Sequence, residues 1–166
     1  MKKLMKVIAP LLLVLVVNSA YTMIAADFNG TWKLDAGTDL SSVSRSNEMP
    51  AAISLIMTDS TVSFERIFNS MPDPSKQVLK LNGAELVSAK GGSETKRTLT
   101  LSADKMLLTV KSKTHTVPEE GEPFDYSRTE TYELEKDGKS LTLTRVLLMP
   151  DRTETAKAVY NKKPMN

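Results

Sequence analysis

Residues 136–145 read Lys-Asp-Gly-Lys-Ser-Leu-Thr-Leu-Thr-Arg, a tight turn followed by a strand in which leucine and threonine alternate. The Asp-Gly pair supplies the backbone angles that a two-residue hairpin turn requires. In the strand, Leu141 and Leu143 fall on one face and the threonines fall on the other. Such a strand, apolar on one face and polar on the other, is typical of an antiparallel sheet that covers a core.

The same alternation recurs along most of the chain. Leu99 and Leu108 each belong to such a run, and turn sequences such as Asn-Gly at 82–83 separate the runs. The runs predict strands at 28–34, 53–58, 62–68, 77–81, 84–89, 95–101, 106–114, 127–135, 140–148 and 153–161. About ten strands joined by short turns predict an all-β, antiparallel up-and-down meander. Such a sheet usually closes into a barrel or folds into a sandwich to remove its edges, and we expect a closed or partly open barrel.

Two segments interrupt the pattern. Residues 36–52 are rich in serine and contain a proline, and they fit a short helix, a lid or a plain loop. Residues 115–125 contain two prolines and several acids, which predicts a long loop.

The N-terminal 26 residues predict an export signal. A lysine-rich start is followed by an apolar run at 7–17 and by small residues that end in Ala25-Ala26. The run is shorter than the roughly 20 residues that a membrane-spanning helix needs. We expect a signal helix that is cleaved after Ala25 or Ala26, with Ala20 as the second choice; the other interpretation is an uncleaved anchor.

Cleavage defines a domain at 27–166, long enough for one core. Removal of Lys2, Lys3 and Lys6 makes this domain nearly neutral, which argues against a nucleic-acid partner. The chain has no cysteine, which excludes disulfides, thiolate metal sites and lipid attachment to a cysteine. These features predict a soluble periplasmic or extracellular protein that is not a lipoprotein and has no stable membrane insertion after cleavage.

Three short motifs, taken in order, carry a family resemblance. They are Gly30-Thr31-Trp32-Lys33-Leu34, Asp137-Gly138-Lys139-Ser140-Leu141-Thr142-Leu143-Thr144-Arg145 and Val159-Tyr160-Asn161-Lys162. In this order they resemble a group of small exported bacterial lipocalin-like proteins of unknown function. The resemblance implies that Trp32 closes one barrel end and that Arg145 packs across its ring, which are structural roles. The chain departs from typical lipocalins in lacking disulfides and a clear Thr-Asp-Tyr motif.

Little in the sequence indicates catalysis. His115 is the single histidine, and no serine in a Gly-x-Ser-x-Gly setting accompanies it, so we interpret it as an exposed side chain. The acids at 119–125 lack the ligand spacing of a calcium loop, and one histidine is too few for a catalytic zinc site. The prediction is a non-enzyme without cofactor or metal.

The fold analogy favours binding of a small apolar or amphipathic molecule inside the barrel. The interior candidates for ligand contact are Leu99, Leu108, Leu141 and Leu143. The alternative is a structural or envelope-interaction module whose core is filled. An empty apolar cavity of a few hundred Å³ would favour the binder and a packed core the module.

Overall fold

The computed structural model describes residues 27–164 and contains ten antiparallel strands and one short 3₁₀ helix, η1 (Arg45–Asn47). The strands are β1 (Gly30–Leu34), β2 (Ala52–Met57), β3 (Thr61–Ile67), β4 (Ser75–Lys80), β5 (Leu86–Lys90), β6 (Ser93–Leu101), β7 (Leu107–Thr116), β8 (Phe124–Leu134), β9 (Ser140–Leu148) and β10 (Thr153–Lys162). All ten predicted strands are confirmed. The predicted export signal and its cleavage sites precede or adjoin the start of the described residues and remain predictions.

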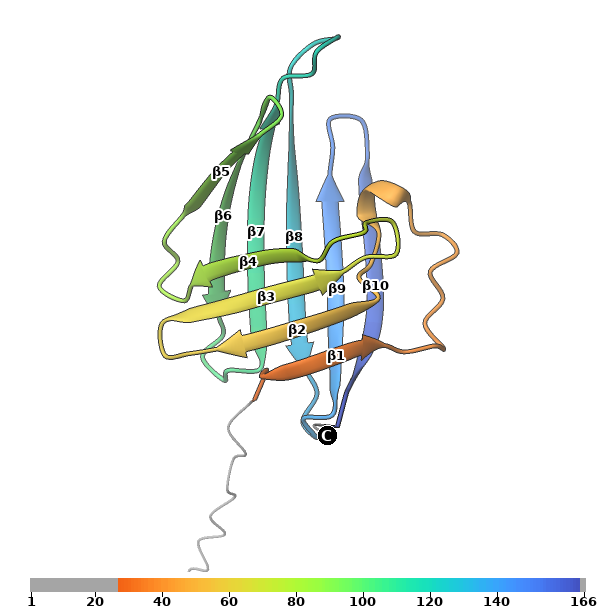
Figure 1. Ribbon diagram of the computed structural model, residues 1–166, viewed down its shortest axis with the longest axis vertical. Coiled ribbons are helices and arrows are strands. Elements are labelled where there is room, and N and C mark those ends of the chain that lie inside the picture. Colours follow the sequence, from red (N-terminus) through yellow and green to blue (C-terminus); the bar gives the residue numbers. More distant parts are fainter. Residues whose placement is uncertain (1–26, 165–166) are drawn as a thin grey trace, which may run out of the picture.

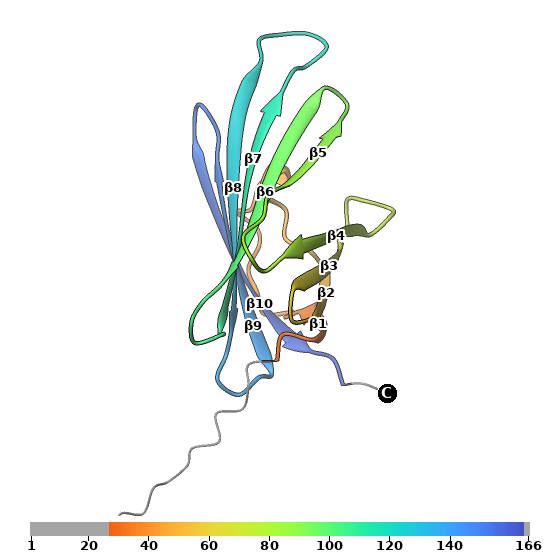
Figure 2. The ribbon, with the colours of Figure 1, turned by 90° about the vertical axis from the view of Figure 1, so that its left-hand side faces the viewer.

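The strands form one sheet in the order β4-β3-β2-β1-β10-β9-β8-β7-β6-β5. Neighbours in the chain are neighbours in the sheet, except that β1 pairs with β10 and β4 is not bonded to β5. In Figure 1, β1–β4 run across β6–β10, and Figure 2 shows the two groups facing each other. The sheet therefore forms a nearly closed barrel with a single gap between β4 and β5, as predicted.

The two interrupting segments differ in how well they were predicted. The connection between β1 and β2 contains only η1, which lies beside β9 and β10 (Figure 1). The predicted loop at 115–125 is too long, because His115 pairs with Asp125 and Thr116 with Phe124 in the β7–β8 ladder. The alternation of inward and outward side chains continues through these polar residues, so β8 begins three residues before its predicted start.

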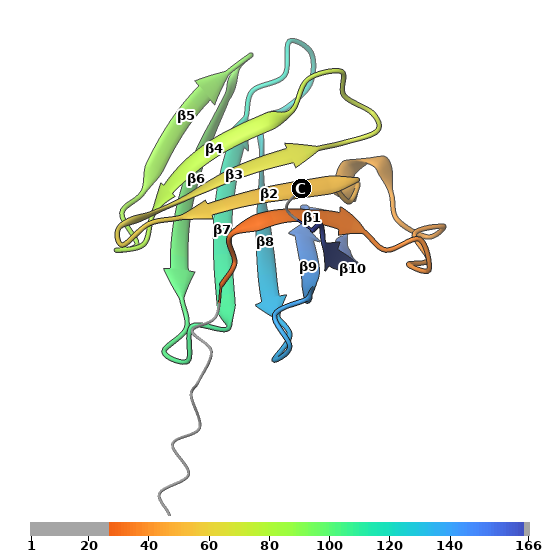
Figure 3. The same ribbon diagram turned by 60° about the horizontal axis from the view of Figure 1, so that its bottom comes forward.

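Apolar side chains fill one end of the barrel. The buried cluster contains Trp32, Phe28 and Tyr160, and all three side chains are inaccessible to solvent. The Nε1 of Trp32 donates a hydrogen bond to the carbonyl of Phe28 at 3.0 Å. The end view in Figure 3 shows β1 and β2 passing in front of β7–β10 at this end. Trp32 thus lies buried in the barrel near the point where β1 meets β10.

The side chain that covers the ring of Trp32 is Lys162. Its Nζ lies 5.2 Å from the ring centroid, within the range of a cation–π contact. Gly30 makes room for it, since a Cβ there would lie 2.9 Å from Lys162 Cε, and its φ of +128° suits glycine. Arg145 instead lies 5.8 Å from the ring of Phe68. The predicted pairing of Arg145 with Trp32 is therefore wrong, because Trp32 is paired in register with Lys162 on β10.

Among residues 27–164, no helix is long and apolar enough to cross a membrane.

Candidate functional site

The inward-facing side chains change from apolar to charged along the barrel axis. The strand registers arrange them in three successive rows across β6–β9. The rows are Leu101, Leu108, Tyr132 and Leu143; then Leu99, Val110, Glu130 and Arg145; then Arg97, Ser112, Arg128 and Leu147. On the opposite wall, the inward-facing side chains of β3 also change from apolar, at Val62 and Phe64, to charged, at Arg66. The barrel interior is thus apolar at one end and polar at the other.

A buried ionic network lies at this boundary. Glu130 Oε2 accepts a hydrogen bond from Arg66 Nη2 at 2.9 Å, and Glu130 Oε1 lies 3.1 Å from Arg145 Nε. The Tyr132 hydroxyl donates to Glu130 Oε2 at 3.0 Å and accepts from Arg66 Nε at 2.9 Å. Since a buried charge is costly unless it is paired and hydrogen-bonded, these contacts keep the four side chains together.

The network shifts the pKa values of its members in predictable directions. Burial alone would raise the pKa of Glu130, but the positive charges of Arg66 and Arg145 outweigh it and hold this pKa below its usual value. Burial raises the pKa of Tyr132 far above its usual value. At neutral pH the network therefore contains an ionised carboxylate, two guanidinium groups and a neutral phenol.

Beyond the network lies a small polar cavity of about 120 Å³. Its wall includes Arg66, Gln77, Arg97, Tyr126, Arg128, Glu130 and Arg145. In the described part of the chain, Arg128 Nε and Gln77 Nε2 are buried donors without a hydrogen-bond partner. Buried polar groups in proteins are nearly always paired, so these two unpaired donors, on residues of the cavity wall, are unusual.

The β1–β2 connection, residues 35–51, lies against this part of the barrel. Arg128 Nη2 donates to the carbonyl of Ser46 at 2.8 Å, and Arg145 Nη1 donates to the carbonyl of Glu48. On the far side, Ser46 Oγ donates to Glu154 Oε2 at 3.3 Å. The connection is therefore held by the same arginines that border the cavity.

The leucines predicted to contact a ligand lie on the apolar side of the boundary. Leu99, Leu108, Leu141 and Leu143 are all fully buried in the core cluster. The polar cavity borders Val110 and Phe68 but none of the four leucines. Their contact with a ligand stays a prediction, and the cavity that the structure provides is polar rather than apolar.

Three of the four arginines of the cavity were not predicted from the sequence, and the fourth, Arg145, was expected in a different role. Each of the other three arginines follows or precedes, by two residues, an inward-facing side chain of its strand. These neighbours are Leu99 for Arg97, Glu130 for Arg128 and Phe64 for Arg66. A charged residue in phase with the apolar face is the pattern that could have identified them, since such residues are rarely buried without a partner.

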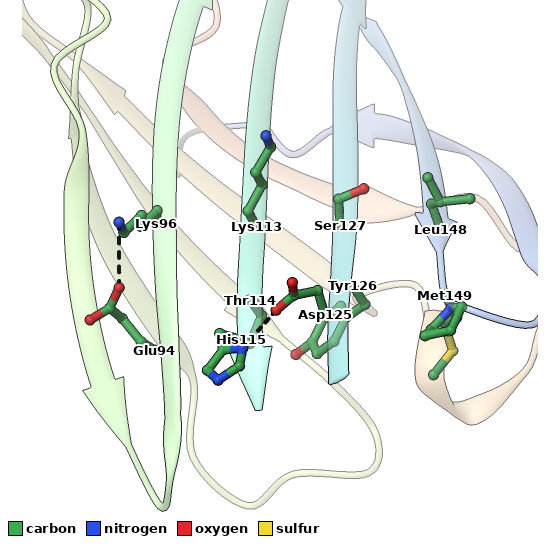
Figure 4. Close-up of a pocket in the computed structure, with 11 residues that line it drawn as sticks. Glu94, Lys96, Lys113, Thr114, His115, Asp125, Tyr126, Ser127, Leu148 and Met149 are labelled. Atoms are coloured by element: carbon green, nitrogen blue, oxygen red, sulfur yellow. Dashed lines mark hydrogen bonds and ion pairs between the residues drawn. The ribbon is translucent and has the colours of Figure 1, made fainter. Parts of the chain in front are cut away.

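A larger hollow, of about 660 Å³, lies on the outer face of the barrel and is shown in Figure 4. Lys113, His115 and Ser127 project into it from β7 and β8, beside Leu148 and Met149. His115 Nδ1 lies 2.7 Å from Asp125 Oδ1, and both side chains are exposed, as predicted for a surface histidine. The hollow is open to solvent, so the buried donors of the inner cavity make that cavity the better candidate site.

No group of three or more His, Cys, Asp or Glu side chains among residues 27–164 is placed to hold a metal ion.

Comparison with solved structures identifies the architecture. The structure of a "secretary abundant heat soluble" protein from Ramazzottius varieornatus matches with a TM-score of 0.52 and 16% identity, over 82% of this chain and 95% of that chain. A point mutant of the REP1-NXSQ fatty acid transporter matches with a TM-score of 0.51 and 16% identity, over 84% and 100%. A fatty acid-binding protein from brain tissue of Drosophila melanogaster matches with 0.50 and 19%, over 81% and 99%.

These matches show that the chain shares its barrel fold with the three solved structures. No protein-family profile matches the sequence of this barrel, and no curated protein matches it in sequence. At 16–19% identity the likeness covers the fold and leaves the site to be interpreted from its own residues.

Proposed function

We propose that this protein is an exported, non-enzymatic barrel that binds a small acidic, amphipathic molecule, with the acidic group in the polar cavity. The observation that carries the proposal is the convergence of Arg66, Arg97, Arg128 and Arg145 on one small, partly enclosed cavity. Guanidinium groups bind carboxylates and other oxyanions through charge-assisted hydrogen bonds. The N-terminal sequence supports export.

The structural neighbours support a binding role rather than catalysis. By their titles, one is a fatty acid transporter and another is a fatty acid-binding protein. In this chain, Val110 and Phe68 line the cavity and would contact the apolar part of the ligand. At about 120 Å³, the cavity is smaller than the roughly 300–1,000 Å³ of pockets that enclose drug-sized molecules. The ligand is therefore short, or it extends out of the cavity.

The alternative is a structural or envelope-interaction module without a ligand. The packing of the apolar end favours it, since Leu108 and the core side chains around it are inaccessible to solvent. In that case the arginines serve only to hold the β1–β2 connection against the barrel.

Thermal shift and native mass spectrometry of the mature protein distinguish the two functions. Butyrate and octanoate should raise the melting temperature saturably, because a ligand that prefers the folded state adds RT ln(1 + [L]/Kd) to its stability. The alcohols 1-butanol and 1-octanol are the matched controls, having the same chains without a charge, and should have no such effect. If acids and alcohols behave alike and no ligand is retained in the mass spectrum, the structural alternative holds.

A further inference from the structure

The polar cavity carries an excess of positive charge. Four arginines line it, and Glu130 is the only carboxylate among the lining residues. Glu130 already pairs with both Arg66 and Arg145. The single negative charge of Glu130 is thus shared by two guanidinium groups. Among residues 27–164, Arg97 and Arg128 form no ion pair with a carboxylate.

These two arginines have neutral partners. Arg97 Nη1 donates to the hydroxyl of Ser88 at 2.8 Å, and Arg128 Nη2 donates to the carbonyl of Ser46 at 2.8 Å. Burial lowers the pKa of both arginines and the nearby positive charge of Arg66 or Arg145 lowers it further, while Glu130 offsets part of this lowering. The cations therefore repel one another, and an anion between them would relieve the repulsion.

We propose that the cavity binds a compact group with two negative charges, the phosphate of a phosphate monoester or inorganic phosphate. This inference rests on the proposed function and names the acidic group of its ligand. A monocarboxylate would offset only one of the excess charges, whereas a phosphate dianion offsets those of Arg97 and Arg128. Phosphate carries about −1.5 to −2 charges at pH 7 and presents strong acceptor oxygens, which suit the guanidinium groups in the cavity wall.

The size of the cavity favours phosphate over a dicarboxylate. At about 120 Å³ it has room for one compact head group. A dicarboxylate separates its two charges along a carbon chain, whereas a phosphate holds both on one centre. Arg97 and Arg128 lie on β6 and β8 in one inward-facing row with Ser112 between them, so they approach the cavity from neighbouring positions.

Isothermal titration at pH 7.5 with ligands of equal chain length tests the charge requirement. Butyl phosphate should bind at least ten-fold more tightly than butyrate or butanesulfonate. Sulfonate is the informative control, because it has three oxygens but a single charge. Affinity for butyl phosphate should weaken as the pH falls below about 6, where the phosphate takes up its second proton. Inorganic phosphate, measured in parallel, shows whether the ester chain contributes to binding.

Variants locate the binding. Arg128→Gln and Arg97→Gln should each weaken butyl phosphate binding at least ten-fold while the melting transition shows a folded protein. Lys113→Gln, on the outer face beside the larger hollow, is the matched control and should leave affinity unchanged. Weakening by Lys113→Gln alone would mean binding on the outer face and would overturn the proposal.

The two proposals fail separately. If butyrate and butanesulfonate bind as tightly as butyl phosphate, the inference about two charges is wrong and the acid-binding function stands. If none of the three anions binds, the proposed function itself is wrong.

Discussion

The buried phenol of Tyr132 offers a direct test of the ionic network. Replacing Tyr132 with phenylalanine removes one oxygen and keeps the ring, which is fully buried. That oxygen makes two hydrogen bonds, at 3.0 Å to Glu130 and 2.9 Å from Arg66, and both partners are charged. Hydrogen bonds to charged groups contribute about 1.5–3 kcal/mol each, so we expect a loss of about 3–6 kcal/mol in the free energy of unfolding.

Tyr160 provides the matched control. It is also fully buried, but its hydroxyl donates a single bond, at 2.9 Å, to the neutral carbonyl of Pro50. Tyr160→Phe should therefore cost only about 1 kcal/mol. Urea unfolding of the two variants and the wild type gives both values from the transition midpoints, provided the slopes agree. Equal losses in the two variants would refute the reasoning that charged partners make the Tyr132 hydroxyl more important.

Four further predictions follow from the same structure. Because the folded-state pKa of Glu130 is lowered, its contribution to stability is present above its unfolded pKa of about 4.3 and is lost as the pH falls through the lower folded value. Glu130→Gln should accordingly flatten the loss of stability that urea unfolding shows below about pH 4. Trp32→Ala should cost about 3–5 kcal/mol, and the wild-type fluorescence should be blue-shifted and poorly quenched by iodide, whereas solvent-like emission would contradict its burial. Leu108→Phe should overpack the apolar end and cost about 1–3 kcal/mol in thermal unfolding; a negligible loss would indicate spare volume there. N-terminal sequencing of the exported protein should begin at residue 26 or 27, or at residue 21 if cleavage follows Ala20, and a mature chain that retains Met1 would contradict the export signal.

The fold was predictable because alternation is a local property of the sequence. Each run such as 140–148 carries its own inward and outward faces, and turns such as Asp137-Gly138 mark where the next strand begins. The main error at a strand boundary lies at 115–125, where polar residues on both faces hid the ends of β7 and β8. There the two strands continue to pair beyond their predicted ends, and no local sequence pattern predicts this extension.

The candidate site was not predictable to the same degree, because it depends on which strands face one another. Arg66 and Glu130 are 64 residues apart in the chain and meet only when β3 crosses over β8. Likewise, which cation covers Trp32 depends on the pairing of β1 with β10, and Lys162 and Arg145 are both plausible from sequence alone. Contacts of this kind form only when the barrel closes. In the sequence, the only sign of them is a charged residue on the otherwise apolar face of a strand.

The pairing of β1 with β10 also has a consequence for the order in which the chain can fold. All other pairings join strands that are consecutive in the chain, so each can form as a local hairpin. The β1–β10 pair joins residue 32 to residue 162, and closing so large a loop has a high entropic cost. Trp32 and its covering Lys162 therefore come together only after the last strand has been synthesised. Until then β1 lacks one neighbour, and no strand pairing joins β1–β4 to the other strands, because β4 and β5 are not hydrogen-bonded to each other.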